Sequence, residues 1–174
     1  MANCCDLDMH LLFDSDEHAA DFEKEVRVPG GPSYTGGAKL SDDRYVFDGE
    51  TVRHGSEVSV LGWVKWGLED WELMDLVRRF PGVASLRAEM REDGNRIKCV
   101  YRWGRAQPDE LEYTWLPVED WPEWKDEYGE DPEAWDERLE DAYDSRQRCI
   151  SIPFEGIEEE RKAMDARFAQ SGKA

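Results

Sequence analysis

The sequence has few cysteines, and none of them is spaced for a metal or a redox pair. Cys4, Cys5, Cys99 and Cys149 form no C-x-x-C motif and no zinc-ligand pattern. Cys4 and Cys5 are neighbours, and a disulfide between adjacent residues is strained. We therefore expect reduced thiols, which are typical of a cytoplasmic protein.

The sequence also lacks long apolar runs. No stretch approaches the ~20 apolar residues that cross a bilayer. The beginning of the chain, MANCCDLDMHLLF, has neither the basic start nor the long apolar core of a signal peptide. We therefore expect a protein that stays in the cytoplasm and is not held in a membrane.

Basic residues are scarce relative to acidic ones. The 174 residues include 22 Lys and Arg against 41 Asp and Glu, a formal net charge of -19. Nucleic-acid phosphates and anionic lipids repel such a chain, so neither is an expected direct ligand. The expected partner is a basic protein surface, such as that of a nucleic-acid-binding protein or complex.

Recognisable catalytic motifs are also missing. The three histidines, His10, His18 and His54, are scattered, and no nucleophile stands in a recognised elbow. The glycine-rich stretch at 29–41 lacks the G-x-x-x-x-G-K-[ST] spacing of a phosphate loop, and the acidic stretch at 126–137 lacks EF-hand spacing. The sequence therefore predicts a non-enzymatic protein with no catalytic residue, cofactor or metal, in which His10 is structural.

What is present is enough apolar material for a core, 40% of the residues. Val58, Val60 and Val64 alternate along 57–66, which predicts a half-buried strand. The stretch at 68–80 has helical spacing, acids in its first turn and arginines in its last, as the helix dipole favours. Similar patterns predict strands at 6–14, 44–52, 83–91, 96–105 and 110–116, a helix between Ser15 and residue 28, and a loop at 28–37.

This order of elements, β-α-β-β-α-β-β-β, is typical of an α+β ferredoxin-like fold. We expect an antiparallel sheet with two helices packed on one face, formed by residues 1–116. The strand at 110–116 is expected at an edge of that sheet.

Several short motifs resemble a known family. The start MANxC leads into a strand and a helix; GWVKWG, a helix that ends in RRFP, and YRWG follow later. This pattern is similar to the YubB-type ferredoxin-like domain of phage- and plasmid-encoded proteins, mainly over 57–105 and more weakly over 1–26. The resemblance implies the fold and a mobile-element origin, and it implies no catalytic residues.

The acidic residues are concentrated in one region. Residues 109–144 contain 16 Asp and Glu and two basic residues, a net charge of -14. Large aromatic residues alternate with these acids at helical spacing, which predicts helices at 121–128 and 132–145 whose aromatic sides dock on the sheet. Asp120 and Asp131 each precede a proline-containing first turn, as N-caps do. Residues 117–174 are thus expected to form an acidic helical extension packed on the first domain.

Carboxylates held on docked helices suggest mimicry of phosphates. We expect a binding protein that occupies a basic nucleic-acid-binding surface, as a DNA-mimicking anti-CRISPR inhibitor would. The expected partner-binding residues are Glu119, Asp120, Glu123, Asp126, Glu127, Glu130, Asp131, Glu133, Asp136, Glu137, Glu140, Asp141 and Asp144.

The alternative is a general interaction or assembly module. Trp63 and Trp66 fall on opposite faces of their strand, so one of them can lie exposed on the sheet. The helix expected near the end of the chain, at 152–170, has an apolar stripe at Ile157, Met164 and Phe168. That stripe packs on its own domain or on a second helix. Sequence alone leaves the oligomeric state open.

Overall fold

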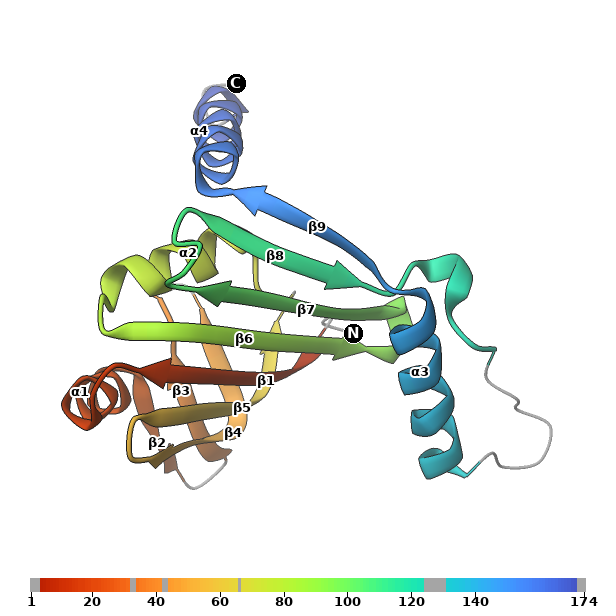
Figure 1. Ribbon diagram of the computed structural model, residues 1–174, viewed down its shortest axis with the longest axis horizontal. Helices are drawn as coiled ribbons and strands as arrows, with labels where there is room; N and C mark the ends of the chain where they lie inside the picture. The colour runs from red at the N-terminus through yellow and green to blue at the C-terminus, as the bar shows by residue number, and fades with distance from the viewer. Residues whose placement is uncertain (1–3, 32–33, 42–43, 66, 124–130, 172–174) are drawn as a thin grey trace.

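A computed structural model describes residues 4–31, 34–41, 44–65, 67–123 and 131–171 (Figure 1). In these segments nine strands form one sheet, and each strand is antiparallel to its neighbours. In their order across the sheet, the strands are β2 (Arg27–Gly31), β3 (Tyr34–Lys39), β4 (Tyr45–His54), β5 (Glu57–Lys65), β1 (Cys4–Phe13), β6 (Val83–Glu92), β7 (Ile97–Gly104), β8 (Glu110–Trp115) and β9 (Arg148–Pro153).

Helices lie on both faces of this sheet. The described helices are α1 (Asp16–Val26), α2 (Asp70–Arg79), α3 (Pro132–Arg146) and α4 (Phe154–Ser171). None of them is long and apolar enough to cross a membrane. We call the face that carries α1 and α2 the first face and the opposite one the second face. α3 lies across one end of the sheet, and α4 projects past β9 (Figure 1).

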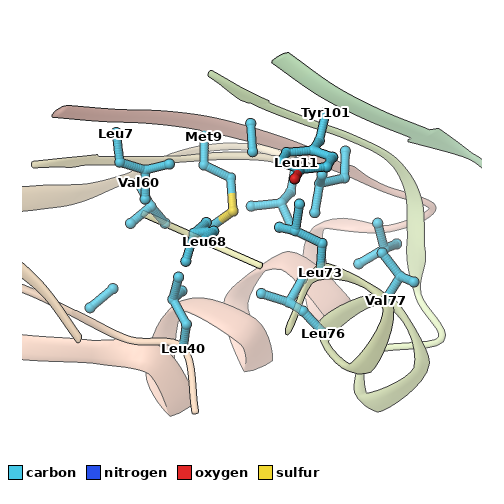
Figure 2. Close-up of a cluster of buried hydrophobic side chains, with 14 of the residues drawn as sticks. Leu7, Met9, Leu11, Leu40, Val60, Leu68, Leu73, Leu76, Val77 and Tyr101 are labelled. Carbon is cyan, nitrogen blue, oxygen red and sulfur yellow. The ribbon is translucent and has the colours of Figure 1, made fainter. Parts of the chain in front are cut away.

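The main core lies between the first face and helices α1 and α2. Alternate residues of β1, including Leu7, Met9 and Leu11, point into it because successive side chains of a strand face opposite ways. Leu73 of α2 and Phe22 of α1 are almost completely buried against them. Figure 2 shows Met9 and Leu11 pointing from the sheet toward the side chains of α2. This layer is the expected core of the predicted first domain.

The local signals for α1 and α2 are confirmed. Ser15 is the N-cap of α1, and its hydroxyl accepts a hydrogen bond from the His18 N–H at 3.2 Å. At α2, Glu69 and Glu72 form a reciprocal capping box, which satisfies main-chain donors at the start of the helix. The expected strands along 6–14, 44–52, 57–66, 83–91 and 96–105 are also present as β1, β4, β5, β6 and β7.

The ferredoxin-like prediction is wrong. α1 and α2 do share one face, but the sheet has nine strands in the described segments and a further helix, α3, covers the second face. α1 leads into β2 at the far edge of the sheet, so β2 and β3 extend the sheet beyond β4, and β7, β8 and β9 extend it beyond β6.

The predicted loop at 28–37 is also wrong, because this stretch contributes to β2 and β3. Its glycines allow close strand contact instead of marking a loop. A Cβ atom on Gly37 would lie 1.9 Å from the carbonyl oxygen of Val46 on β4, and Gly36 has a φ of 118°, which favours glycine. Composition alone therefore pointed to the wrong structure.

The strand at 110–116 is present as β8, but it is not at an edge. β9, which the sequence did not predict, pairs along it from Glu110↔Pro153 to Trp115↔Arg148. The sheet thus contains strands from both sides of residue 116, and Phe154 and Ile157 of α4 belong to the main core. The division into units at 1–116 and 117–174 stays a prediction.

Candidate partner-binding surface

Helix α3 is anchored to the second face of the sheet by three buried side chains. Trp135 and Tyr143 are each 6% exposed and Leu139 is fully buried. They pack with Val100 of β7 and with Leu116 and Trp121 in a cluster separate from the main core. Because the residues on either side of Val100 belong to the main core, Val100 must point to the opposite face. The aromatic docking expected for 132–145 is therefore observed.

The helix begins and ends near the predicted residues. The Asp131 side chain accepts a hydrogen bond from the Glu133 N–H, and Pro132 occupies the first helical position, where its missing N–H leaves no hydrogen bond unmade. The other expected helix, 121–128, is absent from the part of that range that the structure describes. Residues 121–123 follow a short 3₁₀ turn, Val118–Asp120, and are not helical, whereas 124–130 lie outside the described residues.

A buried lysine connects α3 to the sheet. Lys98 of β7 is 1% exposed, and its Nζ lies 2.9 Å from Oε1 of Glu89 and 2.7 Å from Oε1 of Glu140 on α3. The ammonium also lies 5.0 Å from the ring centroid of Tyr143, a favourable cation–π distance. Burial of Glu89 opposes its ionisation, but Lys98 and then Arg87 outweigh this and lower its pKa below 4.5. The Glu89 carboxylate of this bridge is therefore charged at neutral pH.

Four further expected residues are also used within the chain. Asp136 accepts a hydrogen bond from Arg91 at 2.8 Å, and Glu119 one from Arg148 at 2.8 Å. Asp120 lies 3.8 Å from Arg146, and Asp131 caps α3 as described above. These carboxylates, together with Glu140, hold the acidic segment to the rest of the molecule and are partly neutralised there.

The remaining expected residues on α3 face solvent. Glu133, Glu137, Asp141 and Asp144 are exposed, and none forms an ion pair with another described residue. At about 100° per residue they lie within an arc of about 80°, roughly opposite Trp135, Leu139 and Tyr143. We call these four residues the acidic ridge. Glu123 is also exposed, whereas Asp126, Glu127 and Glu130 lie outside the described residues.

The sequence reasoning missed every basic residue that positions α3. Lys98 and Arg91 alternate with core residues along their strands. The sequence pattern was therefore sufficient to predict that their side chains point to the second face. What could not be read was that α3 covers this face, because the two strands are far from α3 in the sequence.

A second polar group on the sheet was also missed. His10 on β1 has its Nδ1 2.8 Å from Ser59 Oγ on β5 and its Nε2 2.7 Å from Asp8 Oδ1. His10 and Ser59 border a shallow hollow of about 500 Å³ together with Arg87. A Ser-His-Asp chain suggests a nucleophile, but in β1 and β5 the main-chain N–H groups serve strand pairing and do not form an oxyanion hole. We interpret the hydrogen-bonded Ser59, His10 and Asp8 side chains as a polar contact within the sheet.

Two further features bear on the chemistry of the molecule. Within the described residues, no group of three or more His, Cys, Asp or Glu side chains is arranged to hold a metal ion. Cys5 and Cys99 are buried, and burial raises the pKa of their thiols to about 12 and about 11. These two cysteines are therefore poor nucleophiles.

No protein-family model, curated protein or solved structure matches this chain.

Proposed function

We propose that this chain is a non-enzymatic binding protein that occupies a basic, nucleic-acid-binding surface of another protein or complex. The acidic ridge on α3 makes the contact. The ridge supplies negative charge that a basic groove attracts, and the docked helix keeps that charge in one arrangement. Preorganisation of this kind favours fast and specific association because little conformational freedom is lost on binding.

The observation that carries the proposal is that the inner side of α3 is packed on the sheet, whereas the acidic ridge on its outer side forms no ion pair with another described residue. Leu139 is fully buried, and Lys98 and Arg91 each hold a carboxylate on the flank of the helix. An acidic segment needed only for solubility would require none of these contacts. The ridge is thus held in place by aromatic packing and by ion pairs at its side.

Charge spacing on α3 is comparable to that of nucleic acid. The helix has six carboxylates in 15 residues, a length of about 22 Å. This gives one carboxylate per about 3.7 Å, close to the one phosphate per 3.4 Å of a single DNA strand. Within the ridge, residues four apart are separated by about 6 Å along the axis. A row of Lys and Arg side chains that binds phosphates can therefore bind these carboxylates.

The concrete form of the proposal is an inhibitor encoded by a mobile element and acting in the cytoplasm, of the anti-CRISPR kind. The similarity of the GWVKWG, RRFP and YRWG motifs to YubB-type proteins supports such an origin. Free thiols at the four cysteines are compatible with a reducing compartment.

The test is displacement of labelled duplex DNA from purified DNA-binding proteins, among them an RNA-guided nuclease loaded with its guide. We expect the chain to displace DNA from at least one of them, and less effectively as salt rises from about 50 mM to about 300 mM. The variant E133Q/E137Q/D141N/D144N, which neutralises the ridge, should lose at least about ten-fold in potency, about 1.4 kcal/mol.

A matched control carries the same change of net charge at four exposed carboxylates outside α3, E17Q/D21N/E155Q/E159Q. It should retain most of the potency. Equal loss in both variants would show that net charge alone matters. No loss in either would reject the ridge as the contact surface.

A second candidate function, an assembly module with an apolar interface, is favoured by one other observation. On the second face, Phe47 is 38% exposed and stacks on Trp63 at 4.8 Å between ring centroids. Such a patch is typical of a partner site. Binding through it would respond little to salt, in contrast to binding through the ridge.

A further inference from the structure

Strand β9 forms one edge of the sheet, and its outer side has no neighbouring strand in the described part of the chain. Five of its six residues are exposed, and Ile150 is 47% exposed. The opposite edge is different: β2 has only five residues and contains Pro29, which cannot donate to a strand ladder. An open strand edge with an apolar residue at its centre is a template for a further strand.

The direction of the main-chain groups shows which residues can pair. The Phe154 N–H donates a hydrogen bond to the carbonyl oxygen of Asp109, so at this position the backbone points toward β8. In an antiparallel pair, successive residues point their N–H and C=O groups alternately toward the neighbouring strand and away from it. Ile152 and Ile150 therefore point their N–H and C=O groups toward β8, and Ser151 and Cys149 point theirs outward.

Pro153 restricts the possible registers. It also falls at an outward position, and it has no N–H to donate. A register that places Pro153 opposite Cys149 would lose hydrogen bonds. A register that pairs Cys149 with Ser151 uses every available donor and acceptor of these two residues and is symmetric when the added strand is another β9.

The charge distribution indicates where two copies of this chain can approach. Residues 1–108 carry -6 and residues 109–144 carry -14, whereas residues 145–174 carry +1, which together give the total of -19. β9 itself contains no carboxylate, and its one charged residue is Arg148. Two copies repel each other least when they meet there, whereas a basic partner is attracted to the ridge instead.

We propose that a second copy of this chain pairs with β9 to form a symmetric antiparallel dimer. Cys149 of each copy lies opposite Ser151 of the other, and the two Ile150 side chains meet on the twofold axis. Ile150 then forms a non-hydrogen-bonded pair with itself, the type of pair in which side chains are closest, with Cα atoms about 4.5 Å apart. The two sheets join into one continuous sheet.

Helix α4 follows β9 on the first face. It packs there through Phe154 and Ile157, and the Arg161 guanidinium lies 2.6 Å from Asp75 of α2.

The first test is the mass of the chain in solution, measured by sedimentation equilibrium over a range of concentrations. We expect a monomer–dimer equilibrium that becomes tighter as salt rises from about 50 mM to about 500 mM, because salt screens the repulsion between two acidic copies. Binding through the acidic ridge has the opposite salt dependence, so the two associations are distinguishable.

The variant Ile150→Lys should weaken dimerisation by at least about ten-fold, because it places two like charges on the axis. Val118→Lys is the matched control, since Val118 is 55% exposed, lies outside β9 and gives the same change of net charge. A monomeric wild-type chain under all conditions, or equal effects of the two variants, would overturn the proposal. Circular dichroism confirms that each variant is folded.

The second test is a specific cross-link. In a C149S background, Ile150→Cys should form an intermolecular disulfide under mild oxidation, because about 4.5 Å between Cα atoms is within the range for a disulfide. Glu137→Cys in the same background is the control, because Glu137 is exposed on α3, away from the axis. Absence of a cross-link in the Ile150→Cys variant, or equal cross-linking of the control, would contradict the register.

Discussion

The buried ammonium of Lys98 allows the anchoring of α3 to be tested by removing its partners. Lys98 is 1% exposed and is neutralised by Glu89 and by Glu140. The double variant E89Q/E140Q retains both side-chain lengths but leaves the ammonium without a negative partner. We expect it to unfold at much lower urea concentration than the wild type at pH 7.

The magnitude follows from burial. An uncompensated charge left by breaking a buried ion pair costs about 3–5 kcal/mol. Because Glu140 is 55% exposed and water reaches its end of the bridge, we expect the lower half of this range, about 3–4 kcal/mol. With a urea m-value of about 2 kcal/mol/M, the unfolding midpoint should fall by about 1.5–2 M.

The assay is urea unfolding followed by tryptophan fluorescence, with K98M/E89Q/E140Q as the matched control. This triple variant also removes the charge and places a side chain of similar length at position 98, so it should recover most of the lost stability. If the double variant unfolds at the wild-type midpoint, or if the triple variant is as unstable as the double, then Lys98 is not a buried charged anchor for α3.

Other changes have distinct expected outcomes. Leu139→Ala should destabilise the fold by about 2–5 kcal/mol, because Leu139 is fully buried, whereas Glu137→Ala on the exposed side of α3 should change stability by less than about 0.5 kcal/mol, both measured by urea unfolding. Gly49→Ala should lower the stability of the fold by about 1–3 kcal/mol, because the added Cβ would lie 1.7 Å from the Leu61 carbonyl oxygen. Gly104→Ala is the control, since no atom lies within 4 Å of its added Cβ. Equal thermal midpoints of the two variants would contradict the β4–β5 contact. Ellman's reagent at pH 8 should react quickly with exposed Cys149 and slowly with Cys5 and Cys99, because burial raises the pKa of these two thiols to about 12 and about 11. Fast reaction of all the thiols without denaturant would show that the sheet opens around Cys5 and Cys99. The stability that Glu89 contributes should be present above pH 4.5 and lost as the pH falls through its lowered pKa, so the stability difference between the wild type and Glu89→Gln should shrink in acid.

Local patterns predicted the elements that have strong local signals. The alternation of Val58 and Val60 in β5, and the acids in the first turn and arginines in the last turn of α2, appear as expected. The topology did not follow from them. The order of the strands in the sheet depends on pairings such as Leu7↔Gly62 and Trp115↔Arg148, whose residues are distant in the sequence.

The candidate site shows the same limit. Helical spacing of Trp135, Leu139 and Tyr143 was sufficient to predict which side of α3 is buried, and hence which carboxylates face outward. It could not predict that Asp136 and Glu140 are paired, because their partners Arg91 and Lys98 are on other elements. A list of acidic residues therefore overestimates the number available to a partner.

This distinction decides how charge-reversal experiments on α3 should be interpreted. Reversal of Glu140 or Asp136 places a positive charge against Lys98 or Arg91, so weaker partner binding would follow from displacement of the helix even if neither residue touches the partner. Glu137 and Asp141 form no ion pair with a described residue, so their reversal removes negative charge from the surface without disturbing the anchor. If the ridge is the contact, Glu137→Lys should reduce binding while leaving the unfolding midpoint unchanged. Glu140→Lys should lower both. Loss of binding in Glu140→Lys alone would instead show that the position of α3, and not the charge of its outer side, is what the partner requires.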